Sequence, residues 1–456
     1  MSEALLKKST LAVKEESSYG VDPTIAVGNV IRFESIDIGP KYDSIDVDEV
    51  RNTKDTQPKL RGQETDPATI GILLRGCATS GTAPEGDPLY TCAMGTKVAS
   101  AASVVGVGSS TTSIVLASGH GAHYLVNQGI LIPCPTLVTG AVKTSGGTQT
   151  VNSIEMAAGD EANFAVGDII GVATAASERS VTRITAINTT AHTMAVSPAM
   201  THEAQDAATV TKLSLEGTRI TVIATDTLTV SPAVSAAPVQ YDPIRAGVHY
   251  MLTTAELPSF WAEYWRGDLR KEAYAGHKID SMELDLTAGQ KVVAKFSSMG
   301  LSMAKTAGAC SLSPITFNAA EPLVAQSQVV KIDGTLVPCD KFTFRLTNKI
   351  YDRKDITTPG ISKRIQMSRE ITGSFSVVYE DDTIYDAFMA DTRCEALLVV
   401  GRLGLINGNC IILSVPLLKY TDVPMNLDDQ IYKYDATWMG EASSTGEDSI
   451  GAVSFY

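Results

Sequence analysis

Short segments in which apolar and polar residues alternate run through most of the chain, and this period of two predicts β-strands. The residues from Asn29 onward read NVIRFESIDIG and alternate well enough for one buried face. In residues 282–286, the methionine and both leucines fall on one face of a strand, with Glu283 and Asp285 on the other. Long amphipathic helices are few. We therefore predict a mainly β fold.

Two short helices are predicted between the strands, over residues 89–94 and 382–390. Each should start at an aspartate N-cap, Asp87 for the first and Asp382 for the second. Gly95 supplies a C-cap for the first helix. Each helix is therefore expected beside one set of strands.

One strand pattern occurs twice. Residues 276–300 read GHKIDSMELDLTAGQKVVAKFSSMG, and residues 418–440 read LKYTDVPMNLDDQIYKYDATWMG. Three matches lie 140 residues apart: Gln290 and Gln430, Met299 and Met439, Gly300 and Gly440. Weaker matches pair residues 30–34 with 329–333, 50–55 with 350–355, and 69–74 with 371–377. The order of strand, long polar stretch, strand, short helix and strands predicts two copies of one domain.

The composition changes inside the first copy. Residues from about 98 to 240 are rich in Ala, Thr, Ser, Val and Gly and contain two similar hairpins, 183–198 and 219–232. The predicted division is an N-terminal arm (1–28), a first domain in two parts (29–97 and 241–303), an inserted all-β domain (98–240), a linker (304–327), and a second domain with a C-terminal tail (328–456). The polar stretches 42–66 and 357–369 are expected to be long contact-making loops.

Composition and charge exclude several classes of protein. The 456 residues contain no apolar run near the roughly 20 that a membrane-spanning helix needs, and the first residues lack the apolar core of a signal peptide, so we expect neither a membrane protein nor export by that route. Seven widely spaced cysteines without a CxxC motif predict reduced, mostly buried thiols. A formal charge of −14 argues against tight nucleic-acid binding, which requires Lys and Arg to neutralise phosphates.

Candidate chemistry is sparse, and each candidate has a simpler structural interpretation. His120 and His123 could be half of a metal site, but their Gly-rich surroundings predict two loop histidines without a nearby carboxylate. Residues 106–110 lack the Gly-Lys-Ser/Thr and the helix of a phosphate loop, so they are predicted to form a turn. The Gly-Arg-Leu-Gly of residues 401–404 joins two strands.

The remaining candidates also fit structural roles. The Arg-Gly-Asp of residues 266–268 is predicted to be a hairpin turn. The carboxylate pairs 381–382 and 428–429 suit a helix start and a hairpin turn, with a weak metal site as the second interpretation. Aromatic residues at 260–265 and 432–438 suit a core or a subunit interface, or else a ligand platform. We predict no enzyme, no cofactor and no metal.

Several of these segments resemble one known family. The arm KEESSYGVDPT, the segment GDPLYTCAMG, residues 241–303 and the pattern REITGSF at 369–375 are similar to major tail tube proteins of long-tailed, siphovirus-type bacteriophages. The resemblance implies two β-sandwich or barrel-type tube domains, each with a short flanking helix, plus an all-β decoration domain. It covers both halves and leaves out the insert.

The resemblance also implies a function. Tube domains form rings whose inner strands make a continuous barrel, and stacked rings make a hollow virion tail, assembled in the host cytoplasm, through which DNA and the tape measure pass. Usual members carry one domain and form hexamers, so two domains per chain imply a trimeric ring with pseudo-sixfold symmetry. Expected partners are further copies, the tape measure protein, and tail terminator and distal tail proteins, with DNA as cargo that the acidic chain does not bind.

Two other functions remain open from the sequence. One is a distal-tail or baseplate-hub protein of the same fold family, which caps a tube in few copies. The other is a surface adhesin or carbohydrate-binding β-protein, suggested by the Thr- and Ser-rich insert and the Arg-Gly-Asp turn.

Overall fold

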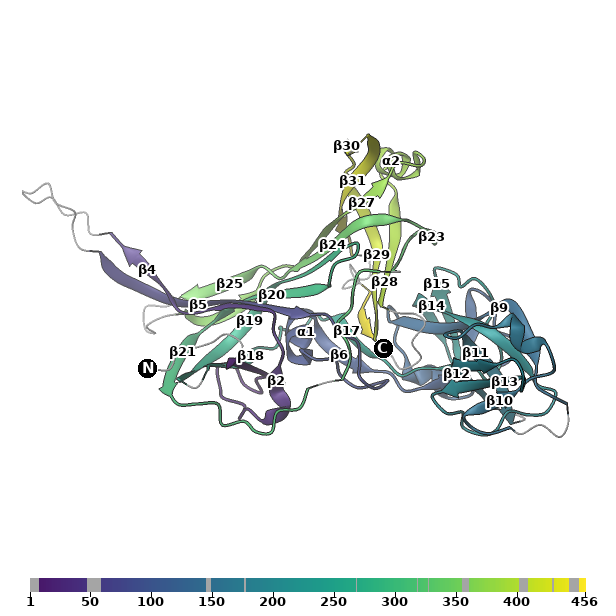
Figure 1. Ribbon diagram of the computed structural model, residues 1–456. Helices are drawn as coiled ribbons and strands as arrows, with labels where there is room; N and C mark the ends of the chain where they lie inside the picture. Colours follow the sequence, from purple (N-terminus) through teal and green to yellow (C-terminus); the bar gives the residue numbers. More distant parts are fainter. Residues whose placement is uncertain are drawn as a thin grey trace, which may run out of the picture.

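The structure is a computed structural model that describes residues 8–46, 59–144, 149–175, 178–267, 269–317, 319–326, 328–354, 361–401, 409–428, 430–442 and 451–456. This part of the chain is mainly β, with two α-helices, α1 (Asp87–Met94) and α2 (Thr383–Met389) (Figure 1). The predicted fold class is confirmed.

One antiparallel sheet joins the first and second halves of the chain (Figure 1). Its strands pair in the spatial order β3, β5, β20, β19, β24, β27, β31 and β29. We call it the central sheet. Their bounds are Ser35–Ile38 (β3), Leu60–Leu73 (β5), Val293–Gly300 (β20), Arg270–Thr287 (β19), Cys339–Thr347 (β24), Glu370–Val378 (β27), Ile431–Gly440 (β31) and Cys410–Asp422 (β29). A short strand, β30 (Met425–Asp428), follows β29 along the same edge of β31.

A second layer of strands covers one face of the central sheet in each half. In the first half it contains β1 (Thr10–Glu15), β2 (Val30–Ile31), β18 (Phe260–Arg266) and β21 (Ser302–Ala307), and in the second half β22 (Val329–Ile332), β23 (Thr335–Leu336) and β28 (Arg393–Gly401). Both halves contribute to one large apolar core. The apolar face predicted from alternation, with Met282, Leu284 and Leu286, lies in this core.

The two helices differ in how deeply their side chains are buried. Six side chains of α1 are buried, whereas α2 has none that is fully buried. Two strands of the first half, β6 and β17, and one from the end of the chain, β32, account for this difference, because β17 pairs with both β6 and β32 and α1 contacts β6 and β17. Their bounds are Gly95–Ala99 (β6), Val248–Leu252 (β17) and Val453–Phe455 (β32). Asp87, predicted as the N-cap of α1, lies inside the helix, because Gly86 takes the N-cap position with a left-handed backbone.

The strand pairings of the two halves shift register at matching places. Between β19 and β20 the shift falls at Ile279/Ser281, and between β29 and β31 it falls at Tyr420/Asp422. The pairs β18–β19 and β28–β29 shift after Phe260 and Cys394. In this scheme β19 has the position of β29, and β24 has the position of β3.

One predicted match between the halves is wrong. Residues 329–333 were expected to correspond to 30–34, but β22 pairs with β28 in the register in which β1 pairs with β18. Val329 thereby takes the place of Thr10, an offset of 319. The similar apolar alternation of the two segments 30–34 and 10–13 made the sequence match ambiguous.

Three terminal or connecting segments also differ from expectation. Residues 10–15, predicted in an extended arm, form the buried strand β1. Residues 302–307, which include the start of the expected linker (304–327), form β21. The end of the expected tail is the buried strand β32, which lies between β17 and β29, while residues 443–450 lie outside the described part.

Glu16 holds β19 where this strand passes from the outer layer to the central sheet. Gly276 has a φ of +64° at this point, a left-handed conformation that favours glycine. One carboxylate oxygen of Glu16 accepts the Gly276 amide at 2.8 Å, and the other accepts the Ser259 hydroxyl at 2.5 Å and the Gly20 amide at 2.8 Å. Glu16 thus ties the segment after β1 to the bend in β19.

The inserted region forms a separate sheet with two apolar cores of its own. The first unit contains β8 (Ser113–Val115), the 3-10 helix η3 (His120–His123), β9 (Gly129–Ala141), the end of β14 (Thr209–Ala224) and β15 (Thr227–Ser231). The second contains β10 (Ser153–Glu155), η4 (Asp160–Asn163), β11 (Ile169–Ala175), β12 (Glu178–Asn188) and β13 (Thr193–Ser197). The two predicted hairpins are confirmed, and both shift register at the same place, Ile184/Ala186 and Ile220/Val222.

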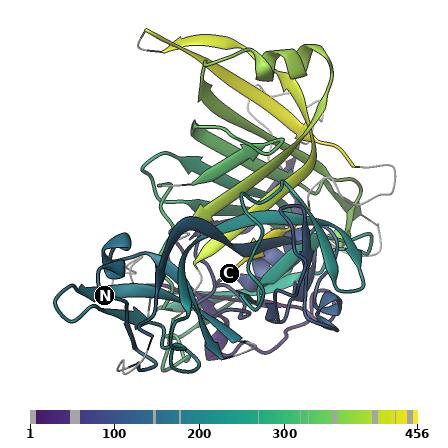
Figure 2. The same cartoon turned by 90° about the vertical axis from the view of Figure 1, so that its right-hand side faces the viewer.

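The inserted region packs against the second half of the chain, as the view in Figure 2 also shows. Leu131 lies in an apolar cluster with Leu397 and Ile412. The Arg219 guanidinium forms an ion pair of 2.8 Å with Glu395, and the Tyr456 hydroxyl donates to the carbonyl of Gly129 at 2.6 Å. These contacts fix the orientation of the inserted region on β28 and β29.

Replacing Glu16 tests its role at the bend. Glu16→Ala leaves the amides of Gly20 and Gly276 and the Ser259 hydroxyl without their acceptor, so we expect a loss of about 1–3 kcal/mol in the free energy of unfolding. Urea unfolding followed by intrinsic fluorescence measures this loss. Glu15→Ala, at the neighbouring exposed position, is the matched control. Equal stabilities of the two variants would contradict the assignment.

Candidate assembly interfaces

The residues singled out for metal or phosphate chemistry have structural roles. No group of three or more His, Cys, Asp or Glu side chains that could hold a metal ion occurs in the described part of the chain. The rings of His120 and His123 stack with centroids 5.0 Å apart. A carboxylate does lie at this corner, contrary to expectation: Asp226 accepts the amides of Gly119 and Gly121 at 2.9 Å each, and these bonds lower its pKa. Residues 107–108 form a turn.

The other candidates are also occupied by local contacts. Gly267 has a φ of +60° in the predicted hairpin turn, and Asp268 and residues 402–404 lie outside the described residues. Asp381 accepts the amide of Thr383 at the start of α2, which lowers its pKa. Asp428 pairs with Lys433 at 2.9 Å, and Asp429 is not described. Aromatic residues of 260–265 lie mostly in the core, but Tyr432 is exposed.

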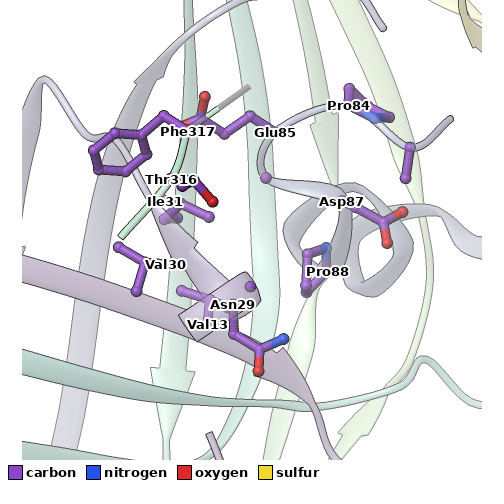
Figure 3. A pocket seen from close by; sticks show the side chains of 13 residues that line it. Val13, Asn29, Val30, Ile31, Pro84, Glu85, Asp87, Pro88, Thr316 and Phe317 are labelled. Carbon is purple, nitrogen blue, oxygen red and sulfur yellow. The ribbon is translucent and has the colours of Figure 1, made fainter. Parts of the chain in front are cut away.

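A cavity of about 270 Å³ lies between the segment before β2 and the start of α1 (Figure 3). Val13, Ile31 and Phe317 supply apolar walls. Its two carboxylates are already engaged, since Glu85 pairs with Arg32 and Asp87 pairs with Lys97 at 2.8 Å. The cavity therefore does not present free charged groups of the kind a catalytic or cofactor site uses.

A buried polar cluster lies where β5, β19 and β26 (Ile361–Gln366) meet. Asp66, His277 and Arg364 are all buried there. Arg364 donates to the carbonyl of Gly300 and to Asp352 at 2.8 Å, while both oxygens of Asp66 lack a hydrogen-bond partner. Burial raises the pKa of Asp66 to about 6 and lowers the pKa of His277 to about 3. Because Arg364 belongs to the hairpin of β25 (Ile350–Lys354) and β26, this cluster anchors that hairpin to the first half.

In their described residues, the two long polar stretches expected as loops consist mostly of paired strands. β4 (Lys41–Ile45) pairs with the start of β5, and β25 pairs with β26. The tips, residues 47–58 and 355–360, lie outside the described residues. Figure 1 shows the β4–β5 hairpin reaching far beyond the central sheet. All five residues of β4 are exposed, whereas β26 has two buried residues.

The junction of β19 with β24 is where the two halves of the chain meet. Seven residue pairs, from Ser281↔Thr347 to Thr287↔Lys341, join the two strands in antiparallel register. Leu284 and Leu286 on β19 are each only 2% exposed, because the second half covers them. At this junction, β24 of the second half pairs with the edge strand β19 of the first half, so the two halves form one sheet.

The two ends of the central sheet are unpaired edges. In the described part of the chain, β3 pairs only with β5, and β30 pairs only with β31. By their pairing with β31, Met425 and Leu427 hold the positions that Leu284 and Leu286 hold in the first half. Met425 is 47% and Leu427 is 63% exposed. An exposed apolar edge strand is a template for pairing with another chain.

Outside the core, the opposite face of the central sheet is polar. Directly paired residues share a face, and one continuous row crosses all eight strands. It runs Ser35, Gly71, Lys295, Glu283, Arg345, Thr372, Met439 and Lys419. Neighbouring rows are rich in hydroxyl groups, among them Thr343, Ser374 and Thr437. The described residues of this face offer no apolar surface comparable to the exposed Met425 and Leu427 of β30.

The pKa of Asp66 predicts a stability difference that depends on pH. The folded carboxyl titrates near pH 6, and the same group in an unfolded chain titrates near about 3.9. The unfolded state therefore loses this proton first, and the free energy of unfolding falls as the pH rises from about 4 to 6. Asp66→Asn cannot ionise, so its stability relative to the native chain should increase over that window in urea unfolding. A constant or shrinking difference would contradict the pKa assignment.

A comparison with known families identifies the fold. The family model of the phage tail tube protein matches residues 222–409, and no curated protein matches the chain. The matched range contains β19, β24 and the junction between them. In the described residues, no helix is long and apolar enough to cross a membrane. The match over residues 222–409 supports a phage tail tube protein, that is, a structural component of a phage tail.

Proposed function

We propose that three copies of the chain close into a ring and that stacked rings form the hollow tail tube through which DNA and the tape measure protein pass. One observation carries the proposal. Equivalent apolar positions are buried at the junction of β19 with β24 and exposed at the free edge formed by β30. The edge formed by β30 therefore lacks the strand that β24 supplies to β19. β3 is the equivalent of β24, so β3 of another copy would fill this position.

The repeated pairing scheme supports two copies of one tube domain in each chain. Both copies use four strand positions in the central sheet, β3, β5, β20 and β19 in the first and β24, β27, β31 and β29–β30 in the second. Their register shifts coincide. Chance does not produce the same irregularities at matching places in two unrelated sheets. Three chains then supply six tube domains.

The internal junction supplies a register for the contact between chains. Within the chain, Asp285 lies opposite Thr343 and Leu286 lies opposite Phe342. The first strand of this junction is β19. Asn426 and Leu427 of β30 correspond to its residues Asp285 and Leu286, as the pairing of β30 with β31 indicates. β24 is the second strand of the junction, and β3 is its equivalent in the first half. The pairing of β24 with β27 and of β3 with β5 makes Asp37 the equivalent of Thr343 and Ile36 the equivalent of Phe342. We therefore expect Asn426 opposite Asp37 and Leu427 opposite Ile36 of the next chain.

The resulting barrel is wide enough for its cargo. Eight strand positions per chain give twenty-four in a ring of three. With strands about 4.8 Å apart and tilted by about 35–45°, the backbone diameter is roughly 45–50 Å. A ring of this size leaves an open channel, as barrels with fewer strands already do. A DNA duplex passes through such a channel.

The polar face of the central sheet would line the channel. Its described charged residues are Lys295, Lys341, Arg345, Lys419 and Lys433 against Asp37, Glu283, Asp285, Glu370, Asp422, Asp428 and Asp435, a net of −2 from five basic and seven acidic groups. The chain as a whole carries −14, so most of the acidic excess lies elsewhere. A weakly acidic, hydroxyl-rich wall offers DNA no basic surface to bind.

The remaining surfaces fit the same assembly. The hairpins β4–β5 and β25–β26 extend along the tube axis in this arrangement and would contact the next ring, and tail terminator and distal tail proteins would meet the same surfaces at the tube ends. The inserted domain lies on the side of β28 and β29 away from the channel and would project outward. Assembly would take place in the host cytoplasm, where the seven free thiols stay reduced.

An engineered disulfide tests the contact between chains and the number of chains at once. Asp37→Cys with Asn426→Cys should form a disulfide between neighbouring chains, because the transferred register places these residues opposite each other. Oxidised tubes on a denaturing gel without reductant should show a covalent ladder that stops at three chains.

The control variant moves one cysteine by two residues. Ser35→Cys with Asn426→Cys keeps both thiols on the same face but out of register, and it should give little cross-linking. A ladder that continues to six chains would contradict the trimer. Equal cross-linking of both pairs would contradict the register. A protein that forms rings but never long tubes would instead be a tube cap such as a distal-tail or hub protein.

A further inference from the structure

The segment that precedes the second domain packs on the first domain. Residues 321–326 run beside the ends of β5 and β20, where Leu323 donates its amide to the carbonyl of Leu74 at 2.8 Å and accepts the amide of Val292 at 3.0 Å. Ala325 donates to the carbonyl of Gln290 at 2.7 Å. Leu323 and Ala325 are buried, while Val324 between them is exposed and lies opposite Lys291. The segment behaves as a short added strand with one apolar face.

The equivalent place on the second domain is uncovered. Leu74 donates to the carbonyl of Val292 at 2.9 Å, and Tyr379 donates to the carbonyl of Tyr432 at the same distance, so the two pairs correspond. Leu74 and Val292 are 1% and 0% exposed, but Tyr379 and Tyr432 are 38% and 55% exposed. We call Tyr379, Ile431 and Tyr432 the tyrosine site. Large apolar side chains exposed at a position that is covered in the sister domain indicate a missing partner.

The chain contains a segment that corresponds to the missing cover. Because Val329 takes the place of Thr10, residues 323–325 correspond to residues 4–6, which read Ala-Leu-Leu and lie outside the described residues. Ala4 and Leu6 then correspond to the inward-facing Leu323 and Ala325, and Leu5 to the outward-facing Val324. If the segment docked in the same way, the smaller Ala4 would face the larger Tyr379 and Tyr432, which would conserve the volume of the contact.

We propose that residues 4–6 of one chain dock as a short strand on the tyrosine site of the neighbouring chain. The inference rests on the proposed ring, in which β3 of the same neighbour pairs with β30. Within the chain, β24 and the segment before β22 both contact the first domain. Their equivalents in the first half are β3 and the segment before β1, so these two elements should both contact the second domain of one neighbour. Each contact between chains would then have two parts, the paired edge strands and the docked segment.

Charge is consistent with this occupant. Lys7 and Lys8 follow the docking residues directly. The surface around α2, next to the tyrosine site, carries Glu380, Asp381, Asp382 and Asp386. Opposite charges at the rim of an interface favour encounter of the correct partners, although each exposed pair adds little affinity.

A second engineered disulfide tests the docking separately from the ring. Leu5→Cys with Ile431→Cys places thiols at the positions equivalent to Val324 and Lys291, which lie opposite each other inside the chain. We expect cross-linking between chains in assembled tubes, with the same three-chain limit as Asp37→Cys with Asn426→Cys. Leu6→Cys with Ile431→Cys is the matched control, because residue 6 faces inward and should cross-link poorly.

The outcomes separate the two proposals. Cross-linking of the Asp37/Asn426 pair without the Leu5/Ile431 pair would overturn the docking and leave the ring intact. Failure of both pairs would overturn both. A Leu5/Ile431 cross-link confined to single chains would show that the segment docks on its own second domain, which also contradicts the proposal.

Charged substitutions provide a measurement without cysteines. Leu6→Asp places a charge on the buried face of the docked segment, so the critical concentration for tube formation should rise about tenfold or more. Leu5→Asp, on the exposed face, should change it less than about twofold. Because the proposed contact is with the neighbouring chain, neither substitution should change the stability of the monomer. Equal effects of the two variants would overturn the assignment of the inward face.

Discussion

The pairing of β19 with β24 is the contact on which the whole arrangement depends. It joins two halves with the same strand scheme into one sheet, and it buries Leu284 and Leu286 under the second half. Burial of each such leucine stabilises the fold by about 1.5–3 kcal/mol. Since β30 presents equivalent residues without cover, the same contact is available once more at the free edge. In the proposed ring, the internal junction is the template for the junction between chains.

The two halves of the chain differ in how far their equivalent positions are covered. The first is complete, because β17, β6 and β32 cover α1 and the segment 321–326 covers Leu74 and Val292. The second domain leaves α2, Tyr379 and Tyr432 at the surface. In the proposed ring, elements of the next chain would cover these exposed sites. Glu16 contributes by fixing the bend of β19, the strand that supplies the internal junction.

Much of the fold followed from local pattern, but contacts over long sequence distances did not. Alternation identified the strands around 282–286, and the 140-residue offset identified β19–β20 and β29–β31 as equivalent pairs. Pattern alone could not distinguish residues 10–13 from 30–34 as the counterpart of β22, since both alternate and only the partner strand differs. The division of the insert into two similar units was missed, although residues 117–132 and 157–172 carry a visible repeat. The aromatic residues at 432–438 were expected in a core or a subunit interface, but the sequence could not distinguish the exposed Tyr432 from the buried Tyr434 and Trp438.

The symmetry of the assembled ring tests this account most directly. Tubes grown from the purified chain and imaged by electron cryomicroscopy should show threefold rings whose wall is one continuous barrel of twenty-four strands, eight from each chain. β30 of each chain should lie beside β3 of the next. Rings of six whole chains, or a wall in which β30 and β3 remain unpaired, would contradict the account.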